Sequence, residues 1–293
     1  MRATPIRQPV IVAVVALASA LAAAAVLPGA AAAGPTVPTG RAALAAVNAL
    51  PPTPNTAWGL DPATGRLLVT VSDAAPIAGA ARLLAVASRF GAHVVRTRLP
   101  LTEQDLTNPL APADGVLLGG DSINDAKIIC SAGFNVLRGG VRYLLTAGHC
   151  TQGLPDWTGV GPSVVSAFPG TDYGVIRDDQ ATAPGAVNRW DGTAQPITGT
   201  ATSSVGEAVC ASGQTTHVTC GHVTAVGLTV DYGDGNVVHG LIETDVHTDH
   251  GDSGGSLFDG AIGLGMVSGG DGTTDYFQPL PPVLAAYDLV LSP

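Results

Sequence analysis

Three short segments of the sequence carry the side chains that acyl transfer requires. They read TAGHC at 146–150, TDY at 171–173 and GDSGG at 251–255. Acyl transfer needs a hydroxyl nucleophile, an imidazole that takes its proton and a carboxylate that orients the imidazole. Ser253, His149 and Asp172 supply these groups, so the sequence predicts nucleophilic catalysis at a serine.

The glycines beside Ser253 meet a second requirement of the same chemistry. An oxyanion hole needs two backbone N–H groups that point at one spot, and Gly251 permits the unusual backbone conformation that this takes. The chain order also bears on the fold, because an α/β-hydrolase carries G-x-S-x-G after a strand and runs serine, acid, histidine. Here the order is His149, Asp172, Ser253, which argues against that fold.

Short β-strands from residue 116 to the end must position these groups. Apolar and β-branched runs alternate with Gly, Asp and Asn turns at intervals of roughly 8–12 residues, which is typical of an all-β sandwich or barrel. A short helix is expected at 282–287, and residues 117–293 are enough for two small barrels. The predicted strands are 134–136, 141–145, 164–168, 174–176, 218–219, 228–232, 237–242, 257–258 and 261–267.

A smaller unit precedes the β region. Residues 58–60 and 67–71 flank a turn and predict a hairpin. Apolar residues at helical spacing within 78–90, followed by Gly91, predict a helix with a glycine C-cap, and 94–99 predicts a strand. We expect a β-β-α-β unit at about 58–100, whose core is too small for secure folding alone. The Ala-, Pro- and Thr-rich residues 34–57 predict a linker.

The first 33 residues predict export. Arg2 and Arg7 precede an unbroken run of apolar and small residues with one serine at 10–26, and the small residues Ala31, Ala32 and Ala33 follow a Pro-Gly break. This pattern is typical of a secretory signal peptide cleaved after Ala33. A membrane anchor is the alternative, since the run approaches the ~20 residues that span a bilayer. We expect a secreted protein with no membrane association after signal removal.

Charge excludes one class of partner and hints at another. The net charge is −10 and the chain has a single lysine, Lys127, so no basic surface for nucleic acid is expected. Six arginines face five acids between residues 41 and 115, whereas five basic residues face 18 acids from residue 116 onward. A slightly basic first part and a strongly acidic second part favour docking of one on the other.

Four cysteines fit an exported protein. Cys130, Cys150, Cys210 and Cys220 all lie in the β region, and three pairings are possible. Their spacing favours two local pairs, 130 with 150 and 210 with 220. A metal site is the rival interpretation, but the sequence has no C-x-x-C pair.

Taken together, these motifs resemble those of secreted bacterial serine endopeptidases of the chymotrypsin family, in the streptogrisin and alpha-lytic protease branch. The resemblance implies two six-stranded antiparallel β-barrels with a short C-terminal helix, preceded by a small α+β propeptide domain. It divides the chain into a signal peptide at 1–33, a propeptide at 34–116 and a protease domain at 117–293. The implied partners are protein or peptide substrates and the propeptide itself, which assists folding and inhibits the enzyme.

The same resemblance assigns roles to single residues. His149 is the general base and then acid, Asp172 orients it, and Ser253 is the nucleophile. The N–H groups of Gly251 and Ser253 form the oxyanion hole. The two local disulfides match bridges of the family, and neither a cofactor nor a metal is implied; we expect a monomer. Substrate backbone pairs with Ser268, Gly269 and Gly270.

Departures from the family pattern concern the specificity pocket and Asp252. A third cystine beside the pocket is absent, with His247 at one of its positions, and Ala211 replaces the arginine that pairs with Asp252. We expect another cation or hydrogen-bond donors to serve Asp252.

The pocket itself leaves several alternatives open. Large apolar residues are expected at P1, the substrate residue before the scissile bond. Glutamate is the alternative, with His247 and His250 lining the pocket; no carboxylate is evident for a lysine or arginine. A metal site built from these histidines with Asp249 and Asp252 is disfavoured because the spacing matches no ligand signature. A catalytically inactive binding protein of the same fold, or an esterase, is the remaining alternative.

Overall fold

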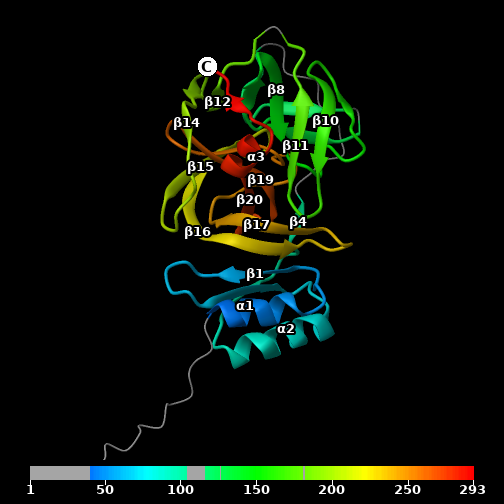
Figure 1. The fold of residues 1–293 in the computed structure, drawn as a ribbon, viewed down its shortest axis with the longest axis vertical. Coiled ribbons are helices and arrows are strands. Elements are labelled where there is room, and N and C mark those ends of the chain that lie inside the picture. The colour runs from blue at the N-terminus through cyan, green and yellow to red at the C-terminus, as the bar shows by residue number, and fades with distance from the viewer. Residues whose placement is uncertain (1–39, 104–115, 126, 181) are drawn as a thin grey trace, which may run out of the picture. The chain divides into compact units, whose positions relative to one another are not determined.

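The computed structural model describes residues 40–103, 116–125, 127–180 and 182–293. All of them fall within one compact region, Val37–Pro293. Strands dominate this region, and helices occur near the beginning and the end of its described chain (Figure 1). The predicted signal peptide at 1–33 lies outside the described residues and stays a prediction.

The amino-terminal unit, residues 40–103, has the β-β-α-β order that the sequence predicted. Strands β1 (Thr56–Leu60) and β2 (Leu67–Ser72) form an antiparallel hairpin. Helix α2 (Ile77–Arg89) follows, and β3 (His93–Thr97) pairs parallel with β2. The unit ends in the short strand β4 (Thr102–Glu103).

The prediction of a linker at 34–57 is wrong in part, because Gly40–Asn48 forms helix α1. Alanine has the highest helix propensity, which explains why this Ala-rich segment is helical. Ala43 and Val47, spaced one helical turn apart, are buried and pack with α2 and the strands. Tertiary packing thus stabilises a helix that is too short to persist alone.

The sheet β1–β3 has apolar residues on both faces, as alternation along a strand allows. Helices α1 and α2 lie over one face (Figure 1). On the other face, Ala57 and Leu68 pack in a cluster with Leu228 and Tyr276 of the second part of the chain. The side chains that pack toward the helices are Trp58, Leu67, Val69 and Val71.

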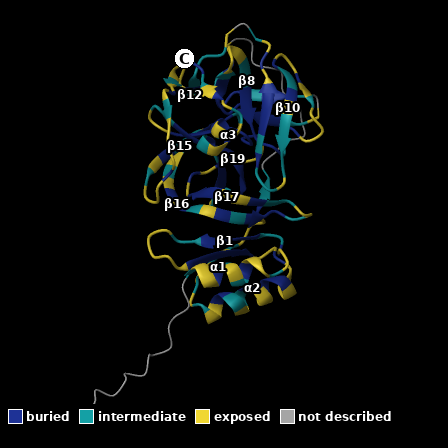
Figure 2. Ribbon diagram, in the orientation of Figure 1, coloured by how far each residue is buried: buried dark blue, intermediate teal, exposed yellow. Residues whose placement is uncertain are grey.

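The second part of the chain contains a closed ring of antiparallel strands, in the order β15–β18–β19–β20–β17–β16 and back to β15. This ring corresponds to one of the two predicted six-stranded barrels. Its interior is apolar and almost fully buried (Figure 2). The strands are β15 (Ala208–Gly213), β16 (His217–Asp231), β17 (Val237–Thr244), β18 (Ser256–Asp259), β19 (Ile262–Gly270) and β20 (Asp275–Pro279).

A second sheet has the order β21–β7–β8–β11–β10–β9 and agrees with the other predicted barrel; all of its strands except β21 precede the ring in the chain. Its strands are β7 (Asn135–Arg138), β8 (Val141–Thr146), β9 (Asp156–Trp157), β10 (Gly161–Ala167), β11 (Tyr173–Arg177) and the C-terminal β21 (Val290–Leu291). Short pairs lie outside it: β5 (Ser122–Asn124) with β6 (Ile129–Ser131), and β12 (Ala186–Asn188) with β13 (Ala194–Pro196). Strand β14 (Gly199–Thr200) pairs with β19.

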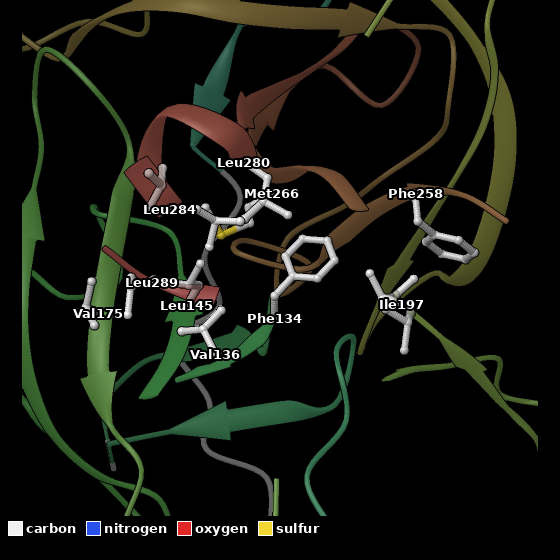
Figure 3. Packing of buried hydrophobic residues seen from close by; sticks show 12 residues of the cluster. Phe134, Val136, Leu145, Val175, Ile197, Phe258, Met266, Leu280, Leu284 and Leu289 are labelled. Atoms are coloured by element: carbon white, nitrogen blue, oxygen red, sulfur yellow. The ribbon is translucent and has the colours of Figure 1, made fainter. Parts of the chain in front are cut away.

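One apolar cluster joins the ring to this second sheet. Leu145 on β8 and Met266 on β19 belong to it, together with Leu280 and Leu284 of helix α3 (Leu280–Ala286). Figure 3 shows these side chains converging below α3. Truncating such a residue to alanine costs about 2–5 kcal/mol, so the cluster rigidly couples the two sheets whose ends carry the candidate site. None of the helices in the described part of the chain is long and apolar enough to cross a membrane.

Candidate active site

Strand register brings His149 and Asp172 together. His149 follows the end of β8, and Asp172 immediately precedes β11. These strands pair antiparallel, with Gly174 opposite Thr146. The end of β8 therefore lies beside the start of β11, and the two side chains meet although 23 residues separate them.

Ser253 lies in the turn between β17 and β18, which packs against the end of β8. Gly254 has a φ of +82°, and a Cβ at this position would stand 2.1 Å from Thr146 Oγ1. Only glycine permits both this conformation and this close approach. The backbone N–H of Ser131 on β6 donates to the Ser253 carbonyl at 2.7 Å, which fixes the turn beside His149.

Ser253, His149 and Asp172 form one hydrogen-bonded chain. Ser253 Oγ lies 2.8 Å from His149 Nε2, and His149 Nδ1 lies 2.9 Å from Asp172 Oδ2. Because a carboxylate only accepts hydrogen bonds, Nδ1 carries the proton and Nε2 accepts from the Ser253 hydroxyl. The side chains of His149 and Asp172 are only 6% and 0% exposed. This geometry allows the serine proton to pass to the imidazole.

Asp172 has further partners that sequence reasoning missed. Ser268 Oγ donates to Asp172 Oδ2 at 2.6 Å, and the Tyr232 hydroxyl donates to Ser268 Oγ at 3.0 Å. Burial raises the pKa of Tyr232 well above its usual value, so this hydroxyl stays protonated. The Asp172 N–H donates to Gln278 Oε1 at 2.9 Å. Ser268 was expected only as a backbone partner of substrate, yet its side chain holds the carboxylate in place.

The peptide bonds that precede Gly251 and Ser253 are oriented by hydrogen bonds that their carbonyl oxygens accept. Thr215 Oγ1 donates to the carbonyl of His250 at 2.7 Å, and the Gly255 N–H donates to that of Asp252 at 2.8 Å. In a trans peptide the N–H points opposite to its carbonyl. The N–H groups of Gly251 and Ser253 therefore point away from these partners, as the predicted oxyanion hole requires.

Asp252 is fully buried beside the nucleophile, and hydrogen-bond donors surround it. The N–H and hydroxyl of Thr216 lie 3.2 and 2.8 Å from its oxygens. The N–H groups of Thr215 and Asp249 lie at 2.7 and 3.0 Å. Burial raises the pKa of Asp252, and these bonds oppose the rise. In the described chain no Lys or Arg forms an ion pair with Asp252. Hydrogen-bond donors therefore serve Asp252 in place of the arginine that the family pattern has at position 211.

Both expected disulfides are present, and they brace the site. Cys130–Cys150 ties β6 to the residue after His149. Cys210–Cys220 joins directly opposite residues of β15 and β16. None of the described cysteines is a free thiol. The described residues contain no group of three or more His, Cys, Asp or Glu side chains able to hold a metal ion.

The predicted substrate strand has a partner in the amino-terminal unit. Strand β4 pairs antiparallel with β19, with Thr102 opposite Gly270 and Glu103 opposite Gly269. Asn236 Nδ2 donates to Glu103 Oε1 at 2.7 Å. Burial raises the pKa of Glu103; its hydrogen bonds oppose the rise, as would a positive charge on the nearby His149. The end of the amino-terminal unit thus lies along the strand edge where substrate backbone is expected to pair, close to His149.

A cavity of about 330 Å³ opens beside this strand edge. Residues 247–250 form one wall and 270–272 another, and Leu99, Pro100 and Thr102 border it. The ring nitrogen Nδ1 of His247 donates to the carbonyl of Gly272 at 2.6 Å. His247 and His250 both line this cavity, and their role in a specificity pocket stays a prediction.

Comparison with known proteins agrees with this geometry. A family profile described as the alpha-lytic protease prodomain matches residues 39–91. Streptogrisin-D of Streptomyces griseus is 42% identical over 246 residues, which are 80% of this chain and 60% of that protein. Glutamyl endopeptidase 2 of the same organism is 41% identical over 187 residues, which are 60% of this chain and 99% of that protein. The chain belongs to the streptogrisin family of serine endopeptidases.

One solved structure is also similar to this chain. It is described as a glutamic acid specific serine protease that uses a histidine triad in substrate binding. It is 40% identical to this chain, with a TM-score of 0.57, and the match covers 60% of this chain and all of that one. The chain spans 60% of the length of Streptogrisin-D.

Proposed function

We propose that this streptogrisin-family chain is the precursor of a secreted serine endopeptidase that acts through an acyl-enzyme intermediate. Ser253 Oγ attacks the peptide carbonyl while His149 Nε2 takes its proton. His149 then protonates the leaving amine. Water, deprotonated by the same imidazole, attacks the acyl group and releases it, and His149 returns the proton to Ser253 Oγ. The observation that carries the proposal is the unbroken chain from Ser253 through His149 to Asp172, with bonds of 2.8 and 2.9 Å.

Two N–H groups complete the proposed mechanism. Those of Gly251 and Ser253 stabilise the oxyanion of the tetrahedral intermediate, and loss of one such donor costs about 2.7–4 kcal/mol of transition-state stabilisation. Ser268 keeps Asp172 in position, and Asp172 in turn keeps His149 in the tautomer that can accept a proton.

The amino-terminal unit is proposed to be the inhibitory propeptide, within residues 34–116. Two contacts support this role. Strand β1 pairs with β16, Ala57 lying opposite Val230, and β4 lies on the Gly269–Gly270 edge. A strand in that position excludes substrate by occupying the same backbone donors and acceptors. Removal of the unit is therefore required for activity.

Glutamate at P1 is a second candidate specificity beside the large apolar residue that the sequence favours. It is supported by the 41% identity to a glutamyl endopeptidase and by the presence of His247 and His250 at the pocket. Both preferences stay predictions, which cleavage of peptides that differ only at P1 distinguishes.

The test of the proposed function is covalent labelling of the secreted, processed protein with a fluorophosphonate, together with casein hydrolysis. We expect labelling at Ser253 and hydrolysis, both absent in Ser253→Ala and both unchanged in Ser204→Ala, which alters an exposed serine. Folded, processed protein that neither reacts nor hydrolyses casein would establish the inactive binding protein instead. Ester turnover without casein hydrolysis would favour an esterase.

A further inference from the structure

A bound peptide must direct one side chain into the cavity beside Ser253. The carbonyl under attack lies between Ser253 Oγ and the N–H of Gly251, and the preceding residues pair with the 268–270 edge. The P1 side chain then falls between segments 247–250 and 270–272. These segments line the 330 Å³ cavity together with Leu99, Pro100 and Thr102 of the amino-terminal unit, so a P1 side chain would enter this space once that unit is removed.

Asp275, at the start of β20, lies directly behind these walls. Its Oδ2 accepts the Thr248 N–H at 2.9 Å, and its Oδ1 accepts the Gly272 N–H at 3.2 Å. A Cβ on Gly270 would stand 1.9 Å from Asp275 Oδ1. The carboxylate therefore fills the place that a side chain at residue 270 would take, and it bridges the two walls where the family's third cystine is missing.

The charge around this pocket is negative on balance. Asp249 and Asp271 belong to its walls, and Asp275 stands behind them. Burial raises the pKa of Asp275 to about 7, and the neighbouring Asp271 adds to the rise. The described lining contains two histidines but neither lysine nor arginine. A positive charge supplied by a substrate would lower the energy of all three carboxylates.

We propose that the pocket selects a basic P1 side chain, lysine or arginine, with Asp275 as the specificity-determining residue. The inference rests on the proposed endopeptidase function, and it replaces the apolar and glutamate P1 preferences considered above with a third class of P1 residue. The fully buried carboxylate of Asp275 does not line the cavity itself, but it bridges the cavity's walls and would attract an ammonium or guanidinium placed between them. A large apolar side chain offers Asp249, Asp271 and Asp275 no countercharge, and a glutamate would add a like charge. The precursor already shows a peptide strand, β4, seated along this pocket.

The first test compares P1 residues on the secreted, processed enzyme. Fluorogenic tetrapeptides that differ only in P1 are assayed with Lys, Arg, Phe, Leu, Glu or Gln at that position. We expect kcat/KM for Lys and Arg to exceed that for Phe, Leu and Glu by about tenfold or more. We also expect benzamidinium to inhibit the enzyme and neutral benzamide to leave it unaffected.

The second test removes the charge and keeps the shape. Asp275→Asn is expected to lower kcat/KM for Lys and Arg peptides by about 30-fold or more, because one partner of a buried charge pair is lost. Peptides with neutral P1 residues should change by no more than about threefold. Asp259→Asn, which removes an exposed carboxylate at the end of β18, is the matched control and should change neither.

The outcomes separate this inference from the proposed function. Preference for Phe, Leu or Glu, or equal losses for all peptides in Asp275→Asn, would overturn the basic-P1 inference and leave the endopeptidase intact. If Asp275→Asn does not fold, the peptide series and the benzamidinium comparison on the unaltered enzyme still decide. A protein without fluorophosphonate labelling and without cleavage of any peptide would overturn both.

Discussion

Burial of Asp275 predicts that the precursor becomes less stable as the pH rises. Its pKa is about 7 in the fold against 3.8 in the open chain. Because the pKa is higher in the fold than in the open chain, the protonated form of Asp275 favours the fold. This contribution is complete below pH 3.8 and is lost as the pH rises through 7. A pKa difference of one between the folded and the open chain corresponds to about 1.4 kcal/mol. This one carboxylate therefore lowers the free energy of unfolding by about 4 kcal/mol between acid and mildly basic pH. Asp275→Asn cannot ionise and should lack this dependence.

The assay is urea unfolding of the Ser253→Ala precursor, which cannot cleave itself, with and without Asp275→Asn. At about pH 4 the variant should be less stable, because one amide oxygen serves two N–H donors and an unmet donor costs about 1–3 kcal/mol. By about pH 8 the difference should have shifted by about 4 kcal/mol in favour of the variant. Parallel stability curves at every pH would show that Asp275 is not a buried, ionising group and would refute the reasoning.

Three other changes test the site and its frame. Ser268→Ala removes a hydrogen bond to the charged Asp172, worth about 1.5–3 kcal/mol, and should lower kcat/KM about tenfold; unchanged kinetics would contradict the positioning role. Replacing Cys210 and Cys220 with serine opens a short loop and should lower the free energy of unfolding by about 3 kcal/mol, as read by urea denaturation. Gly254→Ala forces a left-handed residue against β8 and should destabilise the fold by about 2 kcal/mol or more; an unshifted midpoint would argue against that close approach.

The triad could be predicted because each member lies in a local signature. His149 sits between Ala-Gly and Cys, and Ser253 sits in a glycine-rich turn, so type and spacing were enough. The strand pattern also succeeded where a short run is rich in apolar residues, as in β8. It missed β15, whose residues are mostly small, and β20, where an aromatic pair stands between Asp275 and a glutamine; both strands are held by their partners in the closed ring. Two predicted runs turned out to be one strand, β16.

The groups that surround the triad were not predictable for a different reason. Tyr232 and Gln278 reach the site across separations of 36 residues or more, and nothing in their local sequence marks them. The donors to Asp252 are likewise set by tertiary contact, since Thr215 and Thr216 lie in a turn of another hairpin. Helix α1 was missed because the prolines on both sides of it led to the prediction of a linker, and its apolar stripe is short.

The two separate contacts of the amino-terminal unit make it a bivalent ligand of its own protease. Strand β1 holds the edge of β16, and β4 holds the Gly269–Gly270 edge. When a substrate displaces β4, the β1 contact keeps β4 nearby at an effective concentration on the order of millimolar, so rebinding is fast. If the unit is the inhibitory propeptide proposed above, cutting the chain near residue 116 would not by itself release activity. Activation would then also require that the unit dissociate or be degraded, so the stability of α1, α2 and their sheet would set how long inhibition lasts.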